Sequence, residues 1–162
     1  MNGPLKQHYT WSQIDLVCNL LHEKLVWDKF FPNYIIGLTR GGLIPATILS
    51  HKFSCPLYPL NLSLRDHIRT DIKEWMMVDA FALGRKNILI VDDINDTGAT
   101  FDTLKKQWEE AYKSNNWNEI WHNNVRFAVI DHNLVSKSKI DYCGNIINKS
   151  INDVWIVYPW EN

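Results

Sequence analysis

The first half of the chain predicts two helices and the strand between them. Residues 11–27 carry apolar side chains at three- and four-residue steps, which is typical of a helix with one buried face. Thr10 or Ser12 is placed to cap its start. The short apolar run at 34–38 predicts a buried strand. Residues 45–53 predict a second helix, with proline near its first turn.

The strongest strand pattern is the run Asn-Ile-Leu-Ile-Val at 87–91, which leads through an acidic loop into a helix predicted at 101–112. Residues 65–86 show little periodicity, so we expect a mobile loop with an edge hairpin around 75–81. Further strands are predicted at 57–64, 125–130 and 154–158. Because strands alternate with helices, we expect an α/β fold whose central, mainly parallel sheet is flanked by helices.

Composition narrows the class of protein. A length of 162 residues fits a single domain over 1–162. The 17 basic and 18 acidic residues give a net charge of −1, which argues against a nucleic-acid partner. Three widely spaced cysteines, and a start without an apolar leader, indicate a cytoplasmic protein with free thiols. No apolar stretch approaches 18 residues, so we expect no membrane span.

The segment 88–100, Ile-Leu-Ile-Val-Asp-Asp-Ile-Asn-Asp-Thr-Gly-Ala-Thr, carries the candidate chemistry. In parallel sheets, ligands bind beyond the carboxyl ends of the strands, where Asp92 and Asp93 lie. Gly98 allows a tight turn, and the helix that follows offers unpaired N–H groups and its positive dipole end to an anion. Carboxylates suit sugar hydroxyls or a metal, and the loop suits a phosphate. A ribose 5-phosphate has both features.

This segment resembles the phosphoribosyl pyrophosphate signature of the type I phosphoribosyltransferases. The resemblance implies their fold, with a small C-terminal or hood region beside the sheet. It implies that Asp92 and Asp93 hold the ribose hydroxyls, with Asp93 as the candidate metal ligand. It also implies that Asp96 manages the proton on the base. The residues implied to wrap the 5-phosphate are Asp96, Thr97, Gly98, Ala99 and Thr100. The alternative is an ordinary solvent-exposed acidic turn that caps a helix, but a cap needs only one acidic or hydroxyl residue and this segment supplies several.

A second segment, Ile-Ile-Gly-Leu-Thr-Arg-Gly-Gly-Leu-Ile-Pro at 35–45, is similar to the family's pyrophosphate loop. Arg40 is expected to make charge-assisted bonds to pyrophosphate, while Gly41 and Gly42 let the backbone approach it. Arg-Gly-Gly alone would indicate only a turn. Its place one strand before the acidic motif gives it weight.

The C-terminal run at 153–161 resembles the base-binding end of bacterial xanthine-guanine phosphoribosyltransferases. The resemblance implies that Trp155 stacks on a purine and that Ile156 offers backbone groups to its edge. The alternative places Trp155 in the core and Trp160 at the surface. The resemblance covers most of the chain and is looser at 65–86 and 131–150.

The chain departs from the pattern at Asn133. Enzymes acting on 6-oxopurines usually carry a lysine there, which donates to the purine 6-oxygen. An asparagine amide can donate to a 6-oxo group or, if flipped, accept from a 6-amino group, so the preferred base stays open. Lys137 and Lys139 would need a shifted loop to reach it. His132 is more readily explained as a loop histidine with its bonds satisfied.

The expected reaction transfers ribose 5-phosphate from phosphoribosyl pyrophosphate to guanine, xanthine or hypoxanthine, with Mg²⁺ bound to the donor. Arg65 or Arg69 could reach the pyrophosphate when the 65–86 loop closes. The resemblance also implies a homodimer or homotetramer. Alternatives are a transferase for adenine or a pyrimidine, and a non-catalytic regulator that senses the donor or a purine. A signalling receiver domain fits poorly, because its acidic pair should lie near the first strand.

Overall fold

The computed structural model describes residues 3–62 and 73–162. A five-stranded parallel sheet, with strand order β3-β2-β4-β5-β6, forms its centre, and β1 pairs in parallel with β7 in a separate two-stranded sheet. The elements are β1 (Leu5–His8), α1 (Trp11–Trp27), β2 (Tyr34–Leu38), α2 (Leu43–Phe53), β3 (Leu57–Leu60), α3 (Glu74–Phe81), β4 (Ile88–Asn95), α4 (Ala99–Ala111), β5 (Val125–Asn133), β6 (Tyr142–Ile147) and β7 (Val154–Val157), with 3-10 turns at Trp117–Glu119 and Pro159–Glu161.

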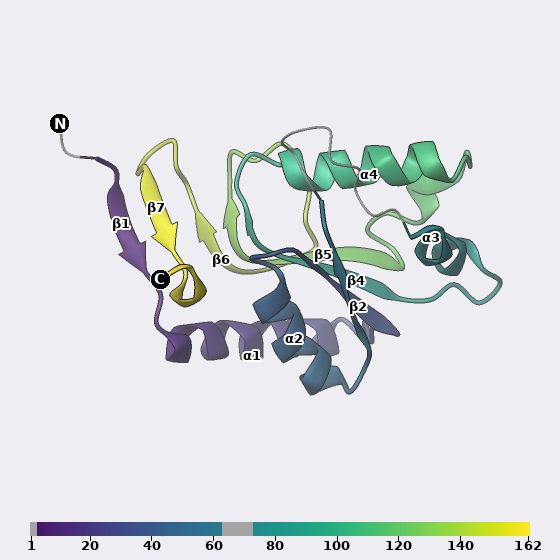
Figure 1. Cartoon of the computed structure of the whole chain (residues 1–162), viewed down its shortest axis with the longest axis horizontal. Coiled ribbons are helices and arrows are strands. Elements are labelled where there is room, and N and C mark those ends of the chain that lie inside the picture. The colour runs from purple at the N-terminus through teal and green to yellow at the C-terminus, as the bar shows by residue number, and fades with distance from the viewer. Residues whose placement is uncertain (1–2, 63–72) are drawn as a thin grey trace.

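The central sheet is buried on both faces. Helices α1 and α2 cover one face and α3 and α4 the other, while β1 and β7 lie to one side (Figure 1). Successive side chains of β4 show the alternation, since Leu89 packs with the α1 and α2 layer and Ile90 with the α3 and α4 layer. Such burial explains why the strands read as continuous apolar runs. The predicted α/β class is confirmed.

Most predicted elements are present, with shifted ends. Helix α1 matches 11–27, and Thr10 caps it through a reciprocal capping box with Gln13. Helix α2 begins two residues earlier than predicted, and α4 begins at Ala99. Strands β4 and β5 extend beyond the predicted 87–91 and 125–130, so that each carries polar residues at its carboxyl end. The part of the predicted strand 57–64 beyond Leu62 lies outside the described residues.

The predicted hairpin at 75–81 is wrong, because these residues belong to helix α3. Met76, Met77 and Ala80 are buried at helical spacing, whereas Trp75 and Val78 are exposed despite being apolar. Those two exposed apolar residues hide the helical period in the sequence. Strands β1 and β6 were not predicted.

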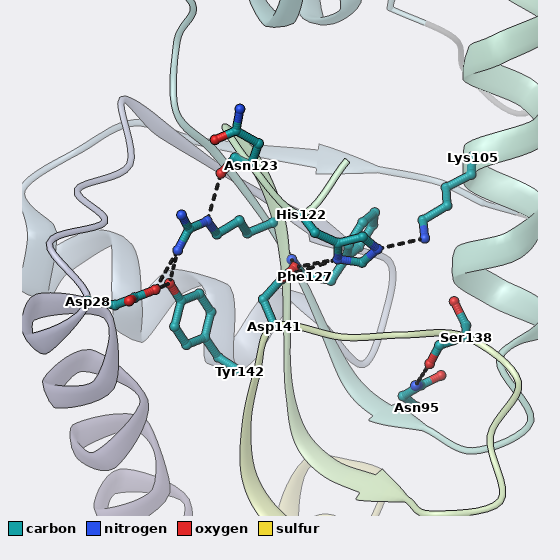
Figure 2. Close-up of polar contacts among 10 residues, drawn as sticks. Asp28, Asn95, Lys105, His122, Asn123, Phe127, Ser138, Asp141 and Tyr142 are labelled. Carbon is teal, nitrogen blue, oxygen red and sulfur yellow. Dashed lines mark hydrogen bonds and ion pairs between the residues drawn. The ribbon is translucent and has the colours of Figure 1, made fainter. Parts of the chain in front are cut away.

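Two polar networks fix the amino ends of β5 and β6 against the helices (Figure 2). In one, Asp28 at the end of α1 accepts hydrogen bonds from Arg126 and from the Tyr142 hydroxyl, at 2.5 and 2.6 Å. In the other, the His122 ring lies between the Asp141 carboxylate and the Lys105 ammonium, each about 3.0 Å away. Both networks lie at the end of the sheet opposite the polar carboxyl ends of β4 and β5.

None of the helices in the described part of the chain is long and apolar enough to cross a membrane.

Candidate active site

The direction in which the chain winds through the sheet reverses between β2 and β4. From β2 the chain passes outward to β3, whereas from β4 it passes the other way, to β5 and then β6. The loops that follow β2 and β4 therefore diverge and leave a crevice between them. In open α/β sheets this switch point is where ligands bind. The two motifs singled out in the sequence are these two loops.

The loop after β2 lies directly against the end of β4. A Cβ atom added at Gly41 would fall 2.0 Å from Asp93 Oδ2, and one at Gly42 would fall 2.3 Å from the Val91 carbonyl oxygen. Only glycine fits at both positions. The peptide bond between Thr39 and Arg40 is cis. The loop thus presents its backbone beside the acidic pair.

A cleft of about 550 Å³ opens at this junction, lined by Arg40, Gly41, Asp93, Trp160 and Glu161. Its volume lies in the usual range for small-molecule sites. The cleft combines an exposed guanidinium with carboxylates, which suits a ligand that carries both phosphate and hydroxyl groups. Arg40, Gly41 and Asp93 were predicted; Trp160 and Glu161 were not assigned roles.

Asp92 and Asp93 form a partly buried carboxylate pair at the end of β4. Asp92 Oδ1 accepts the backbone N–H of Asp93 at 2.9 Å, and Asp93 Oδ1 accepts that of Ile94 at 2.7 Å. Burial, followed by the charge of Asp93, raises the pKa of Asp92 well above its usual range. Burial likewise raises the pKa of Asp93. Groups with perturbed pKa values in a cleft are typical of functional sites.

The loop 96–98 leads into α4 and presents the helix start. Gly98 caps the helix with φ of 92°, a conformation that favours glycine. A Cβ atom at Gly98 would lie 2.6 Å from the backbone nitrogen of Ser138. The first-turn N–H groups of α4 lack intrahelical partners, so the loop is suited to bind an anion.

Buried Asn95, at the end of β4, links this loop to the segment that follows β5. Its amide donates to the Ser138 carbonyl oxygen at 2.9 Å, as Figure 2 shows, and its Oδ1 accepts from Ser136 at 3.0 Å. The same amide nitrogen lies 3.1 Å from His132 Nδ1, which must therefore be the acceptor. The expected loop position of His132 is wrong, because it lies in β5, but its Nδ1 has the hydrogen-bond partner that was expected. Burial lowers its pKa.

Asp96, Asn133 and Lys149 meet beyond the carboxyl ends of β4, β5 and β6. The Asn133 amide donates to Asp96 Oδ1 at 2.9 Å, and the Lys149 ammonium lies 2.8 Å from Asp96 Oδ2. Asn133 is 3% exposed. The structure therefore brings together two predicted residues and one that was missed. Lys149 follows β6, whose sequence has no clear strand pattern, so nothing placed it beside Asp96.

The aromatic residues of the C-terminal segment do not follow the alternative prediction, which placed Trp155 in the core. Trp155 lies in β7 and is 59% exposed, whereas Ile156 is buried. Trp160 is half-buried and stacks on Tyr158, with ring centroids 4.8 Å apart. Tyr158 stacks in turn on Tyr9 at 5.6 Å. Trp160, at the end of this stack, lines the cleft.

Buried Asp131 anchors that aromatic stack. Its two carboxylate oxygens accept the hydroxyls of Tyr9 and Tyr158, each at 2.7 Å. The Tyr158 hydroxyl is also 3.2 Å from the Asp93 carbonyl oxygen. Burial raises the pKa of Asp131, an effect that the two tyrosine bonds oppose. Asp131 therefore connects the C-terminal segment to the acidic strand.

Four other basic residues were considered from the sequence, and the structure describes two of them. Lys137 and Lys139 are exposed, and the backbone of Lys137 donates to the Thr97 carbonyl oxygen at 3.1 Å. Arg65 and Arg69, and most of the predicted loop 65–86 before α3, lie outside the described residues.

Residues 9–158 match the model of the phosphoribosyl transferase domain. The chain belongs to this family. It is 30% identical to the hypoxanthine-guanine phosphoribosyltransferase of Schizosaccharomyces pombe, over 98% of the chain and 90% of that protein. It is 25% identical to the xanthine-guanine phosphoribosyltransferase of Desulfotalea psychrophila, over 99% and 91%. Both relatives align with this phosphoribosyltransferase over nearly their whole lengths.

Solved structures agree. The purine phosphoribosyltransferase of Pyrococcus horikoshii superposes with a TM-score of 0.70 at 28% identity, covering 97% of this chain and 95% of that one. The xanthine-guanine-hypoxanthine enzyme of Helicobacter pylori, at 18% identity and a TM-score of 0.66, supports the fold alone. The predicted family and type I phosphoribosyltransferase fold are confirmed.

Proposed function

We propose that the protein transfers ribose 5-phosphate from phosphoribosyl pyrophosphate to a 6-oxopurine, releasing pyrophosphate. The observation that carries the proposal is the switch point between β2 and β4. There the Arg-Gly-Gly loop lies against Asp93, and the loop that opens α4 begins three residues further on. The names of relatives at 30%, 25% and 28% identity support a purine as acceptor.

The donor is expected to lie across this crevice. Its 5-phosphate would bind the loop at 96–100, where Thr97, Thr100 and the first N–H groups of α4 supply donors. Asp92 and Asp93 would accept from the ribose hydroxyls. Arg40, with the backbone of Gly41 and Gly42, would hold the pyrophosphate in the 550 Å³ cleft.

The reaction breaks the bond between ribose C1 and a pyrophosphate oxygen, and the electron pair leaves on pyrophosphate. A ring nitrogen of the base forms the new bond to C1, and the proton at N7 passes to the Asp96 carboxylate. The protein contributes mainly by positioning the two substrates and by stabilising charge. Arg40 stabilises the charge that develops on the leaving group.

Mg²⁺ is the proposed metal. Asp93 and Asp92 offer the oxygen ligands that this ion prefers, and within the described residues no group of three or more His, Cys, Asp or Glu side chains is placed to hold a metal by itself. Donor oxygens would therefore complete the shell. When bound, the ion offsets the negative charge of pyrophosphate as it leaves.

The base is expected to stack on Trp155, whose exposed indole is free to receive a flat ring, with the backbone of Ile156 at its edge. Asn133 was also predicted to bind the base. In the structure its amide already bonds Asp96 and the Lys149 backbone, which bears on the inference below.

Two further proposals concern the protein's setting. A reducing, cytoplasmic location is supported by three free cysteines. A homodimer or homotetramer is supported by exposed apolar side chains on and beside α1, where Leu16 is 67% and Trp27 is 89% exposed.

Initial rates of pyrophosphate release test the proposal, with phosphoribosyl pyrophosphate, Mg²⁺ and each of guanine, xanthine, hypoxanthine, adenine, uracil and orotate. We expect turnover with at least one 6-oxopurine and little with the pyrimidines. Turnover with adenine alone would keep the transferase and reject the 6-oxopurine. Tight donor binding without turnover of any base would instead indicate a donor-sensing regulator.

A further inference from the structure

Lys149 is the one cation bonded to the carboxylate proposed to take the base proton, among the residues that the structure describes. We infer that Lys149 selects 6-oxopurines over 6-aminopurines by donating to the base's 6-oxygen, and that Asn133 positions Asp96 instead of contacting the base. The inference rests on the proposed function, because it names the acceptor-selecting residue of that same site.

Asn133 is held in one amide orientation, so it cannot flip to suit different bases. Its Oδ1 accepts the Lys149 backbone N–H at 3.2 Å, and its Nδ2 donates to Asp96 Oδ1 at 2.9 Å. Flipping the amide would set Oδ1 against a carboxylate oxygen and Nδ2 against an N–H donor, so both partners enforce one orientation. The side chain is buried, which makes any unpaired end costly.

The same hydrogen bonds of Asn133 also position Lys149 beside Asp96. The bond from Asn133 Oδ1 fixes the Lys149 backbone, and the side chain then reaches the second oxygen of the same carboxylate at 2.8 Å. Asn133 and Lys149 thus bond different oxygens of Asp96. A lysine from the loop after β6 therefore supplies a cation beside Asn133, at the end of β5.

The Lys149 ammonium keeps donors for a ligand. It has three N–H groups, and within the described part of the chain Asp96 receives the one hydrogen bond that it donates. Its side chain is 18% exposed and that of Asp96 is 40% exposed, so the pair is partly open on the side of the carboxylate. A flat ring approaching Asp96 would meet the ammonium next to it.

The edge of a purine matches this arrangement. A 6-oxopurine carries O6, an acceptor, beside N7, whereas adenine carries an amino donor beside N7. An ammonium can donate but cannot accept. When the N7 proton of a 6-oxopurine points at Asp96, the Lys149 ammonium would donate to O6. In adenine the amino group would face the ammonium instead, which places one donor against another. Sites that bond one polar edge reject the wrong partner strongly.

The test removes the positive charge of Lys149 and nearly keeps the length of its side chain. In Lys149→Met we expect kcat/KM for hypoxanthine to fall about 10- to 100-fold, chiefly through KM for the base, with the KM for phosphoribosyl pyrophosphate nearly unchanged. The preference for hypoxanthine over adenine should fall with it. Lys149→Arg should keep most of the preference, and Lys139→Met, at an exposed lysine, should behave as wild type.

A purely structural ion pair would give a different result, because loss of Asp96 alignment would slow both bases alike and leave their ratio intact. That outcome in Lys149→Met overturns the inference while the proposed function stands. Calorimetry with inosine and adenosine 5′-monophosphates separates the two claims without turnover. If wild type turns over no base yet binds inosine monophosphate better in a Lys149-dependent way, the selection stands and the reaction fails. Equal binding of both nucleotides by wild type overturns the selection.

Discussion

The two carboxylate oxygens of Asp96 accept hydrogen bonds from different residues, Asn133 and Lys149, and these bonds fix the orientation of the carboxylate. One oxygen is bonded to a neutral amide and the other to an ammonium. Both partners hold the carboxylate in one orientation beside the loop that opens α4, so the base in the proposed reaction would meet it without rearrangement of the side chain. Asp96 itself was identified from the sequence. Its two partners come from the end of β5 and from the loop after β6, which meet only in the folded protein.

Asp96→Asn should lower kcat about 10²- to 10⁴-fold, because an amide cannot take the base proton. Donor binding should change little, since the backbone N–H groups at 97–100 and the carboxylates at 92 and 93 remain. Steady-state kinetics together with calorimetric binding of phosphoribosyl pyrophosphate measure the two effects separately. Equal kcat in variant and wild type would remove Asp96 from the reaction.

Asp131 gives a second prediction at this scale, through stability. Its pKa is raised in the folded protein, above an unfolded value of about 3.9. Its contribution to the free energy of unfolding is thus present below the unfolded pKa and is lost as pH rises through the folded pKa. Relative to Asp131→Asn, wild type should gain stability as pH falls from about 8 to about 4.5. Urea unfolding at both pH values measures this, and a difference independent of pH would contradict it.

At the scale of elements, the sequence predicts best where one face of a helix or both faces of a strand are buried. Helix α1, with Ile14, Val17 and Leu21 buried, follows the prediction closely. Strand β6 escapes it because Gly144 interrupts the apolar pattern at a point where α1 packs against the strand: a Cβ atom there would lie 2.2 Å from Val17 Cγ1. Strand β1 escapes because all four residues are exposed. Its position depends on pairing with β7, which local sequence does not encode.

The start of α4 offers a test with a matched control. Gly98 and Gly84 both have positive φ, at 92° and 78°, but a Cβ atom meets the Ser138 backbone at Gly98 and open space at Gly84. Gly84→Ala should cost only the left-handed strain, about 1–2 kcal/mol of unfolding free energy. Gly98→Ala should cost more and should also weaken donor binding. Urea unfolding and donor calorimetry on both variants make the comparison, and equal effects would mean that the loop is not held by its contact with Ser138.

At the scale of the whole molecule, one sheet carries stability and chemistry at opposite ends. The networks around Arg126 and His122 fix the amino ends of β5 and β6. The carboxyl ends of β2, β4, β5 and β6 bring together the loops at 39–42, at 96–98 and after β6. The order of motifs in the sequence was enough to predict the family and to single out the two loops that meet at the switch point. It was not enough to predict Lys149 or Asp131, because their partners are far away in sequence and are set by strand order.

The central claim is that this phosphoribosyltransferase makes a nucleotide from phosphoribosyl pyrophosphate and a 6-oxopurine. The most direct measurement quantifies pyrophosphate and nucleoside 5′-monophosphate in one reaction with hypoxanthine and Mg²⁺, by chromatography, with Asp96→Asn beside wild type. The account predicts equal amounts of the two products, formed by wild type and nearly absent with the variant. Donor that binds tightly but yields no nucleotide, or pyrophosphate released without nucleotide, would contradict it.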